Sequence, residues 1–166
     1  MGTSENLQDA FAGESQANRK YLAFAKKAQA DGFGQIARLF RAAADAETVH
    51  AQAHLSVMGG VKGTADNLQA AIEGEGYEFQ EMYPKFLAQA RDEKNKGATA
   101  SFQRALAVEK IHHGLYSEAL QTLQGGKDMP AQRIFVCQTC GNTVLGAPPD
   151  QCPICGARKE GFVEVQ

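Results

Sequence analysis

The sequence predicts a mainly α protein, with a four-helix bundle over residues 1–129 and a small metal-binding β domain over residues 130–166. Four long segments carry apolar residues at helical spacing. Beyond the break "QGGKDMP" this periodicity stops, and the remaining stretch is rich in turn residues and too poor in apolar residues to build a core. All four cysteines lie in that stretch, so we expect a bound metal to hold it together.

The helical segments are separated by the Gly-containing breaks "DGFG", "GGVKGT" and "NKGAT". We expect helices over residues 5–31, 34–58, 66–95 and 99–124. In each, apolar residues form a stripe suited to packing against other helices. Each stripe also contains a carboxylate, and the second and fourth contain a Glu-x-x-His pair. Something must compensate these groups, because an unpaired charge in a dry core costs more than a marginally stable domain can offset.

A shift of 62 residues superposes the two halves of the helical region, which predicts a duplicated helical hairpin. The matched positions include Tyr21 with Tyr83, Glu47 with Glu109, and His50 with His112. Glu14 falls on Gly76, between Glu75 and Glu78. The third helix therefore carries two candidate carboxylates where the first carries one.

The Glu-x-x-His pairs predict a metal centre inside the bundle. Residues three apart on a helix share a face, so each pair can direct an oxygen and a nitrogen to one point. With the acidic residues of the other two helices, the candidate ligands are Glu14, Glu47, His50, Glu75, Glu78, Glu109 and His112. Two cations would neutralise this set, and oxygen and nitrogen ligands without thiolate suit iron or manganese. The pattern is that of di-metal carboxylate sites in ferritin-like bundles.

Each of these residues also has an ordinary structural interpretation when taken singly. A Glu on a stripe often lies at its edge in water, and a His on an apolar face is often a hydrogen-bonded core residue. The coincidence across four helices favours ligation. We expect His54 to pack or lie at the surface and His113 to be exposed. Tyr21 and Tyr83 either hydrogen-bond a ligand carboxylate or simply pack.

The cysteines form two Cys-x-x-Cys knuckles that can bring four thiolates to one tetrahedral metal. The pairs are Cys137 with Cys140 and Cys152 with Cys155. Zinc and iron both accept four sulfurs, so the spacing leaves the metal open. Zinc would make the domain structural, whereas iron would let it carry one electron. No βαβ pattern surrounds either pair, which argues against a thioredoxin-like site.

The charge balance argues against a nucleic-acid partner. The chain has 17 Lys and Arg against 19 Asp and Glu, a net charge of −2, without a basic run. We see no signal peptide, and no apolar run approaches the roughly 18 to 20 residues of a membrane span. We therefore expect a cytoplasmic protein without membrane contact, where clustered cysteines favour a metal site over disulfides.

Five motifs together resemble the rubrerythrin family along essentially the whole chain. They are "FAGESQA", "AETVH", "GEGYEFQEMYP", "VEKIH" and the paired cysteine knuckles, in this order. The resemblance implies a non-haem di-iron centre in the bundle and a rubredoxin-like domain whose cysteines hold a third iron, with zinc as a possible substitute. It also implies that Glu47 and Glu109 bridge the irons, that Glu14 and Glu75 are terminal ligands, and that His112 ligates one iron.

In the family, the other iron exchanges a Glu ligand for a His on reduction, and the matching positions here are Glu78 and His50. Tyr21 and Tyr83 match tyrosines that lie beside the ligands. Members of the family reduce peroxide, so the resemblance implies H2O2 + 2 e− + 2 H+ → 2 H2O, with the rubredoxin-like iron refilling the di-iron pair. We expect NAD(P)H to supply electrons through a separate donor protein, a reductase or rubredoxin, because the chain lacks a Rossmann fingerprint.

Two other functions fit parts of this pattern. A ferroxidase or iron-handling protein would use the same di-iron centre with oxygen, but iron storage needs no dedicated electron inlet such as the cysteine domain. A helical scaffold carrying a zinc ribbon would serve protein contacts, but seven inward-facing ligands argue against it.

The connection between the second and third helices predicts a domain-swapped homodimer. The repeat requires the first and third helices to be antiparallel, so this connection would have to run the length of the bundle. Residues 60–66 reach at most about 25 Å, whereas helices of this size are roughly 37 Å long. We therefore expect the first two helices of one chain to pack with the last two of another. Each di-iron site would then draw ligands from both chains.

Overall fold

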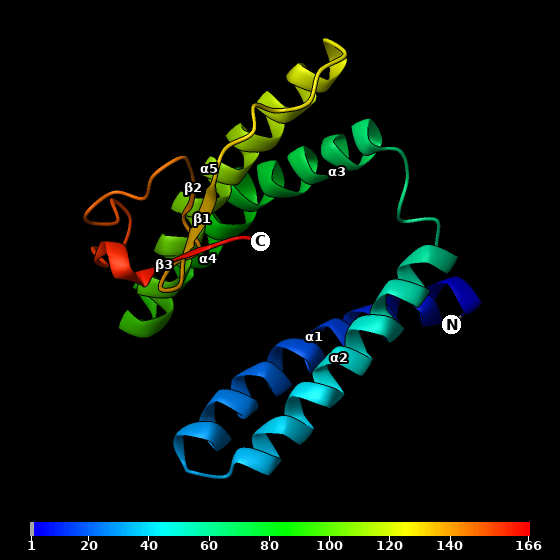
Figure 1. The fold of residues 1–166 in the computed structure, drawn as a ribbon, viewed down its shortest axis with the longest axis vertical. Coiled ribbons are helices and arrows are strands. Elements are labelled where there is room, and N and C mark those ends of the chain that lie inside the picture. Colours follow the sequence, from blue (N-terminus) through cyan, green and yellow to red (C-terminus); the bar gives the residue numbers. More distant parts are fainter. Residues whose placement is uncertain (1) are drawn as a thin grey trace. The chain divides into compact units, whose positions relative to one another are not determined.

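The computed structural model describes residues 2–166, and its helices confirm the predicted fold class (Figure 1). The helices are α1 (Thr3–Ala30), α2 (Gly34–Val57), α3 (Thr64–Tyr77), the π-helix η1 (Glu78–Met82), α4 (Tyr83–Asp92) and α5 (Lys96–Gln124). The third predicted helix is therefore a composite of α3, η1 and α4. Among the described residues, no helix is both long enough and apolar enough to span a membrane.

The chain divides into two compact units, one running to Lys62 and the other formed by Gly63–Gln166. The first unit is the α1–α2 hairpin. Its helices approach closely because small side chains fill the contact, and the buried residues are Ala25, Ala28, Ala37, Ala44 and Ala51. Asn18 ties the helices together by donating from Nδ2 to the Ala44 carbonyl at 2.7 Å.

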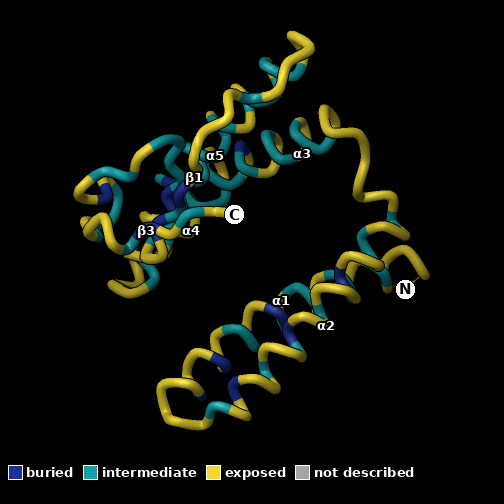
Figure 2. The backbone as a smooth tube through the Cα atoms, viewed as in Figure 1, coloured by how far each residue is buried: buried dark blue, intermediate teal, exposed yellow. Residues whose placement is uncertain are grey.

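Much of this hairpin is exposed (Figure 2), and its exposed residues include large apolar ones. Leu39 is 70% exposed and Val57 is 71% exposed, and the stripe residue Ile36 is also exposed. The most closely packed contact with α1 is the alanine row, and the predicted stripe of the second helix meets α1 only in part, as where the rings of Phe40 and Phe24 lie 5.6 Å apart. A two-helix hairpin has no second layer to cover such residues.

The second helical hairpin repeats the first in detail. Both turns contain a residue in the left-handed conformation, Gly32 at φ 86° and Lys94 at φ 54°, 62 positions apart. Phe24 and Phe40 have ring centroids 5.6 Å apart, and so do their counterparts Phe86 and Phe102. The shared turn and ring geometry supports the predicted duplication.

The second unit also contains the β domain, a three-stranded antiparallel sheet with the order β2-β1-β3. Its elements are β1 (Ile134–Cys137), β2 (Thr143–Leu145), the 3-10 turn η2 (Lys159–Gly161) and β3 (Phe162–Glu164). Only Phe135, Cys137, Cys152 and Phe162 form its buried core. A core this small fits a domain that depends on its metal.

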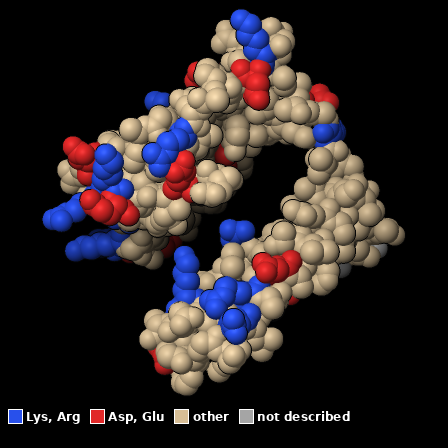
Figure 3. Space-filling model, viewed as in Figure 1, with Lys and Arg blue, Asp and Glu red and all other residues tan. Residues whose placement is uncertain are grey.

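Acidic and basic side chains are interspersed on the face of each unit that Figure 3 shows. One exposed ion pair, Arg133 with Glu164, joins the start of the β domain to β3 with Nε 2.9 Å from Oε1. Such pairs add little to stability on their own.

Candidate metal centre

The first unit brings three predicted ligands together, Glu14 from α1 and Glu47 and His50 from α2. Their ligand atoms all lie within 4.8 Å of one another. His50 Nδ1 is 3.0 Å from Glu47 Oε2 and 4.0 Å from Glu14 Oε1. The His50 side chain is 55% exposed and that of Glu47 only 18%. The imidazole therefore lies at the open side of the cluster.

The second unit contains the repeat-related cluster, Glu75 from α3 and Glu109 and His112 from α5. His112 Nδ1 is 2.8 Å from Glu109 Oε2 and 3.8 Å from Glu75 Oε1. This cluster is the better buried, with His112 only 24% exposed. Two carboxylates and one imidazole around a point make a donor set for iron or manganese.

The electrostatics of the second cluster also fit a bound cation. Burial raises the pKa of Glu75 to about 7, and the negative charge of Glu109 adds to the rise while His112 opposes it. Glu78 is affected in the same way. Burial raises its pKa, and the negative charge of Glu109 raises it further. Carboxylates crowded in this way lack a positive charge, and a metal ion would supply it. The two clusters contain the residues of a di-iron carboxylate centre.

The π-helix η1 accounts for the one-residue offset in the repeat. Glu14 and Tyr21 are seven positions apart, whereas Glu75 and Tyr83 are eight apart. A π turn absorbs one extra residue within a continuous helix. Glu75 and Tyr83 can therefore both keep the places of their counterparts in the uninterrupted α1. The sequence reasoning missed this element, although the offset was its signal.

Glu78, the additional carboxylate, is the first residue of η1. It lies outside the three-residue cluster, yet its raised pKa reports the charge of Glu109. Tyr83 follows η1, and burial, Glu78, Glu109 and Glu75 all raise the pKa of its phenol, in that order of effect. This phenol is therefore kept protonated beside the acidic residues. Its ring lies 6.2 Å from that of Phe102, as the ring of Tyr21 does from that of Phe40.

The two remaining histidines lie outside both clusters. His54 is half-buried on α2. The prediction that His113 is exposed was wrong, because its ring packs edge-on against Phe79 with centroids 5.2 Å apart. Gly76 leaves room for this ring, since a Cβ there would lie 3.4 Å from the imidazole.

One contact near the second cluster was not foreseen. His112 Nε2 lies 2.9 Å from Oγ1 of Thr143, on strand β2 of the cysteine domain. The same domain borders a groove of about 370 Å³ along α5, whose lining includes Glu109, His112 and Cys140. No local sequence pattern could show this, because Thr143 is 31 positions from His112.

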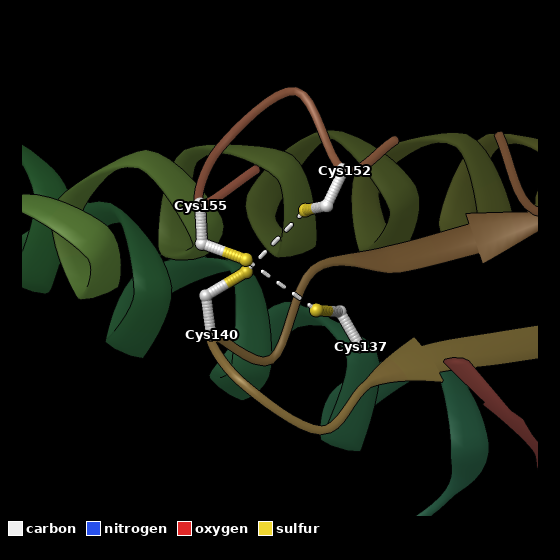
Figure 4. A group of neighbouring side chains, drawn as sticks. All are labelled: Cys137, Cys140, Cys152 and Cys155. Atoms are coloured by element: carbon white, nitrogen blue, oxygen red, sulfur yellow. Dashed lines mark hydrogen bonds between the residues drawn. The ribbon is translucent and has the colours of Figure 1, made fainter. Parts of the chain in front are cut away.

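The four cysteine sulfurs converge from the two knuckles (Figure 4). Cys137 Sγ lies 3.6 Å from Cys155 Sγ, and Cys140 Sγ lies 3.6 Å from Cys152 Sγ. These separations exclude disulfides and approach the roughly 3.8 Å expected between thiolates around a tetrahedral metal with bonds near 2.3 Å. The four residues therefore fit a single iron or zinc ion.

The surroundings of the thiols differ, which also suits a metal. Burial raises the pKa of Cys140 and of Cys155. Burial acts in the same direction on Cys152, but hydrogen bonds from the backbone N–H groups of Cys155 and Ile154 and from the thiols of Cys140 and Cys155 together outweigh it and lower the pKa of Cys152 to about 7. Asn142 adds a side-chain donor, with Nδ2 3.7 Å from Cys152 Sγ. Donors of this kind stabilise a thiolate and tune a bound metal.

Comparison with protein families gives two matches. Residues 5–120 match the family described as rubrerythrin, and residues 135–163 match the rubredoxin-like domain of rubrerythrin. The two matches cover the helical region and the cysteine domain separately.

Individual proteins resemble the chain over nearly its full length. Rubrerythrin-2 of Clostridium acetobutylicum is 37% identical over 174 residues, covering 96% of this chain and 95% of that protein. Nigerythrin of Nitratidesulfovibrio vulgaris is 36% identical, covering 96% and 85%. A structure of partially reduced nigerythrin matches with a TM-score of 0.59 at 33% identity, covering 99% of this chain and 88% of that one. A second, of the fully reduced all-ferrous state, also has a TM-score of 0.59.

Proposed function

The chain belongs to the rubrerythrin family, and from this premise we propose that it reduces hydrogen peroxide to water at its di-iron centre, with electrons fed in by the rubredoxin-like domain. The reaction is H2O2 + 2 e− + 2 H+ → 2 H2O. When bound, the iron pair supplies both electrons, and the cysteine-ligated iron replaces them singly. The electrons come from NAD(P)H through a separate reductase or rubredoxin.

The observation that carries this proposal is the groove shared by Glu109, His112 and Cys140. It supports an electron inlet, because a residue of the cysteine site and two ligands of the di-iron centre border one space within a single unit. A storage protein has no use for that arrangement. The carboxylate-rich donor set adds support, since hard oxygen ligands favour the oxidised metal.

Some of these residues would hold the metal ions, and others would supply protons. Glu47 and Glu109 would bridge the two metal ions, Glu14 and Glu75 would be terminal ligands, and His112 would hold one of the ions. Glu78 and His50 would be the exchangeable ligands, which fits the position of Glu78 in the π-helix and the open side occupied by His50. We assign Tyr83, and Tyr21 by the repeat, as proton donors at the site, because the phenol of Tyr83 is kept protonated by burial and by the charges of Glu78, Glu109 and Glu75.

We place each complete site in a domain-swapped dimer. One copy provides Glu14, Glu47 and His50, and the other provides the ligands of α3, η1 and α5. The exposed apolar side chains of the first unit, such as Leu39 and Val57, fit a hairpin that a second copy covers.

An anaerobic mixing experiment tests the reaction. The iron-loaded protein is reduced and mixed separately with peroxide and with oxygen while the absorbance of both iron sites is followed. We expect fast oxidation by peroxide and slow oxidation by oxygen. The opposite ranking would overturn the proposal and identify a ferroxidase, which uses the same ligands with oxygen.

A further inference from the structure

Thr143 joins the cysteine domain to a ligand of the di-iron centre. Its Oγ1 lies 2.9 Å from Nε2 of His112 and 3.2 Å from the carbonyl oxygen of Gly141. A hydroxyl has one proton to donate and lone pairs to accept. The Gly141 carbonyl can only accept, so a hydroxyl that donates its proton to this carbonyl has a lone pair free to accept the Nε2–H of His112.

This arrangement favours Nδ1 of His112 as the nitrogen that faces the metal. Nδ1 points at the two carboxylates, 2.8 Å from Glu109 and 3.8 Å from Glu75. Imidazole ligands usually donate the N–H of the free nitrogen to a neighbouring group, which fixes both tautomer and ring orientation. Thr143 is the group in that position.

The turn before Thr143 is held by a backbone hydrogen bond and lies against α5. Gly141 directly follows Cys140 and donates its N–H to the Cys137 carbonyl at 2.8 Å. Its φ of 85° suits glycine, and a Cβ there would lie 3.6 Å from the side chain of Val108, which is only 2% exposed on α5. The knuckle that contains Cys137 and Cys140 therefore packs against α5 one turn before His112.

The other half of the repeat lacks this support. Within the described part of the chain, the hydrogen bonds and ion pairs of the His50 ring all involve Nδ1, and the side chain is 55% exposed against 24% for His112. The two ligand histidines thus differ in their contacts. The His112 ring has a hydrogen-bond partner at each nitrogen, whereas the contacts described for the His50 ring are all at Nδ1.

We propose that Thr143 is a positioning residue of the di-iron centre, which holds His112 as the Nε2–H tautomer with Nδ1 on the metal. The inference rests on the proposed di-iron function. It predicts that the Thr143 hydroxyl contributes to metal affinity at the bundle without touching the metal. Loss of such a partner typically costs about 10- to 100-fold in affinity.

The test uses Zn2+ as a diamagnetic probe in the full chain, with the cysteine site already filled. Zn2+ affinity at the bundle is measured by competition with a chromophoric chelator, and the His112 ring is observed by 15N NMR. Thr143→Val removes the hydroxyl at similar volume, and Thr143→Ser restores it. Thr139→Val is the control, because Thr139 is an exposed threonine of the same domain.

In the wild type and in Thr143→Ser we expect an Nε2–H signal from His112 that exchanges slowly with water. In Thr143→Val the signal exchanges fast and Zn2+ affinity falls about 10-fold or more, while the cysteine site and Thr139→Val are unchanged. Unchanged affinity in Thr143→Val, failure of Thr143→Ser to rescue, an equal loss in Thr139→Val, or Zn2+ that does not bind through Nδ1 would each overturn the inference. Peroxide plays no part in these readouts, so a metal-loaded protein inert to peroxide defeats the proposed function alone.

Discussion

Glu75 of α3 and Glu109 of α5 direct carboxylate oxygens to within 4.8 Å of one another, beside the imidazole of His112. Burial and the negative charge of Glu109 hold the proton on Glu75, whose pKa is raised to about 7. This contact makes the metal-free protein sensitive to pH in a direction opposite to that of an ordinary ion pair.

The metal-free protein should lose stability as the pH rises from about 4.5 through about 7. The pKa of Glu75 is raised from 4.5 to about 7 in the folded chain, first by burial and then by Glu109. Between these values the folded state holds a proton that the unfolded state has released, so stability falls with rising pH. Thermal melts across this range measure the slope.

Glu75→Gln should flatten that slope and raise the melting temperature of the metal-free protein at pH 8 by about 2–4 °C, the shift that ~1 kcal/mol produces in a chain of this size. Glu73→Gln, on the exposed side of the same helix, should leave the slope intact. Iron loading of the wild type should also remove the slope, because a bound cation keeps Glu75 ionised. A metal-free wild type that gains stability over this range would contradict the assignment.

The parts of the site that follow local rules were predictable from the sequence. Each Glu-x-x-His pair needs only one helical turn to meet, and His50 Nδ1 and His112 Nδ1 indeed lie 3.0 and 2.8 Å from their glutamates. The knuckles are equally local, and their four sulfurs do converge. Long-range contacts such as that of Thr143 with His112 were out of reach, because nothing near either residue encodes the docking of one domain on a helix.

One prediction was wrong for a physical reason. His113 was placed in water, although Gly76 opens a space for its ring. A second detail lay outside what periodicity gives, since the buried residues between α1 and α2 include five alanines, and small residues let two helices approach closely. Periodicity identifies apolar residues, but the volumes of neighbouring side chains decide which of them are buried within one hairpin.

Deleting Gln80 should convert η1 to α-helix and leave metal binding in the bundle intact. Gln80 is an exposed residue of η1, so its removal converts the π turn to α-helix without cutting into a core. Glu75 and Tyr83 would then be seven residues apart, as Glu14 and Tyr21 are in the uninterrupted α1, and would still share a face because each residue of an α-helix turns by about 100°. Circular dichroism should stay close to wild type, and both the cysteine site and the bundle should keep their iron.

Gln80→Ala removes the side chain without changing the chain length, and it should also keep the bundle iron. A deletion variant that loses the bundle iron while Gln80→Ala keeps it would show that η1 does more than absorb one extra residue.

Glu78→Ala should impair peroxide turnover more than metal retention. Glu78 lies outside the cluster of Glu75, Glu109 and His112, which can hold a metal without it. A group that binds in only one oxidation state contributes chiefly to the step that changes that state. Stopped-flow oxidation by peroxide and iron analysis on the same sample measure the two effects, with the exposed Glu81→Ala as the control. Equal losses of turnover and iron would count against ligand exchange.

The linker between the units should determine the oligomeric state. α2 ends at Val57 and α3 begins at Thr64, so residues 58–63 connect them. Six residues reach roughly 20 Å, whereas α2 with its 24 residues extends about 36 Å. We therefore expect that the two hairpins of one chain do not form an antiparallel four-helix site together, and that the wild type is a dimer with two complete di-iron sites.

Inserting about 15 Gly and Ser residues after Gly60 should produce a monomer with a full di-iron site, because lengthening a flexible loop costs little free energy once it can span the distance. The same insertion between α4 and α5, after Lys94, should leave the dimer intact, since that turn joins helices that already pack together. Light scattering coupled to size-exclusion chromatography gives the mass, and metal analysis across the peak gives the occupancy. A wild-type monomer with both bundle irons bound would rule out the exchange, because the ligands of α1 and α2 would then have met those of α3 and α5 within one chain despite the short linker.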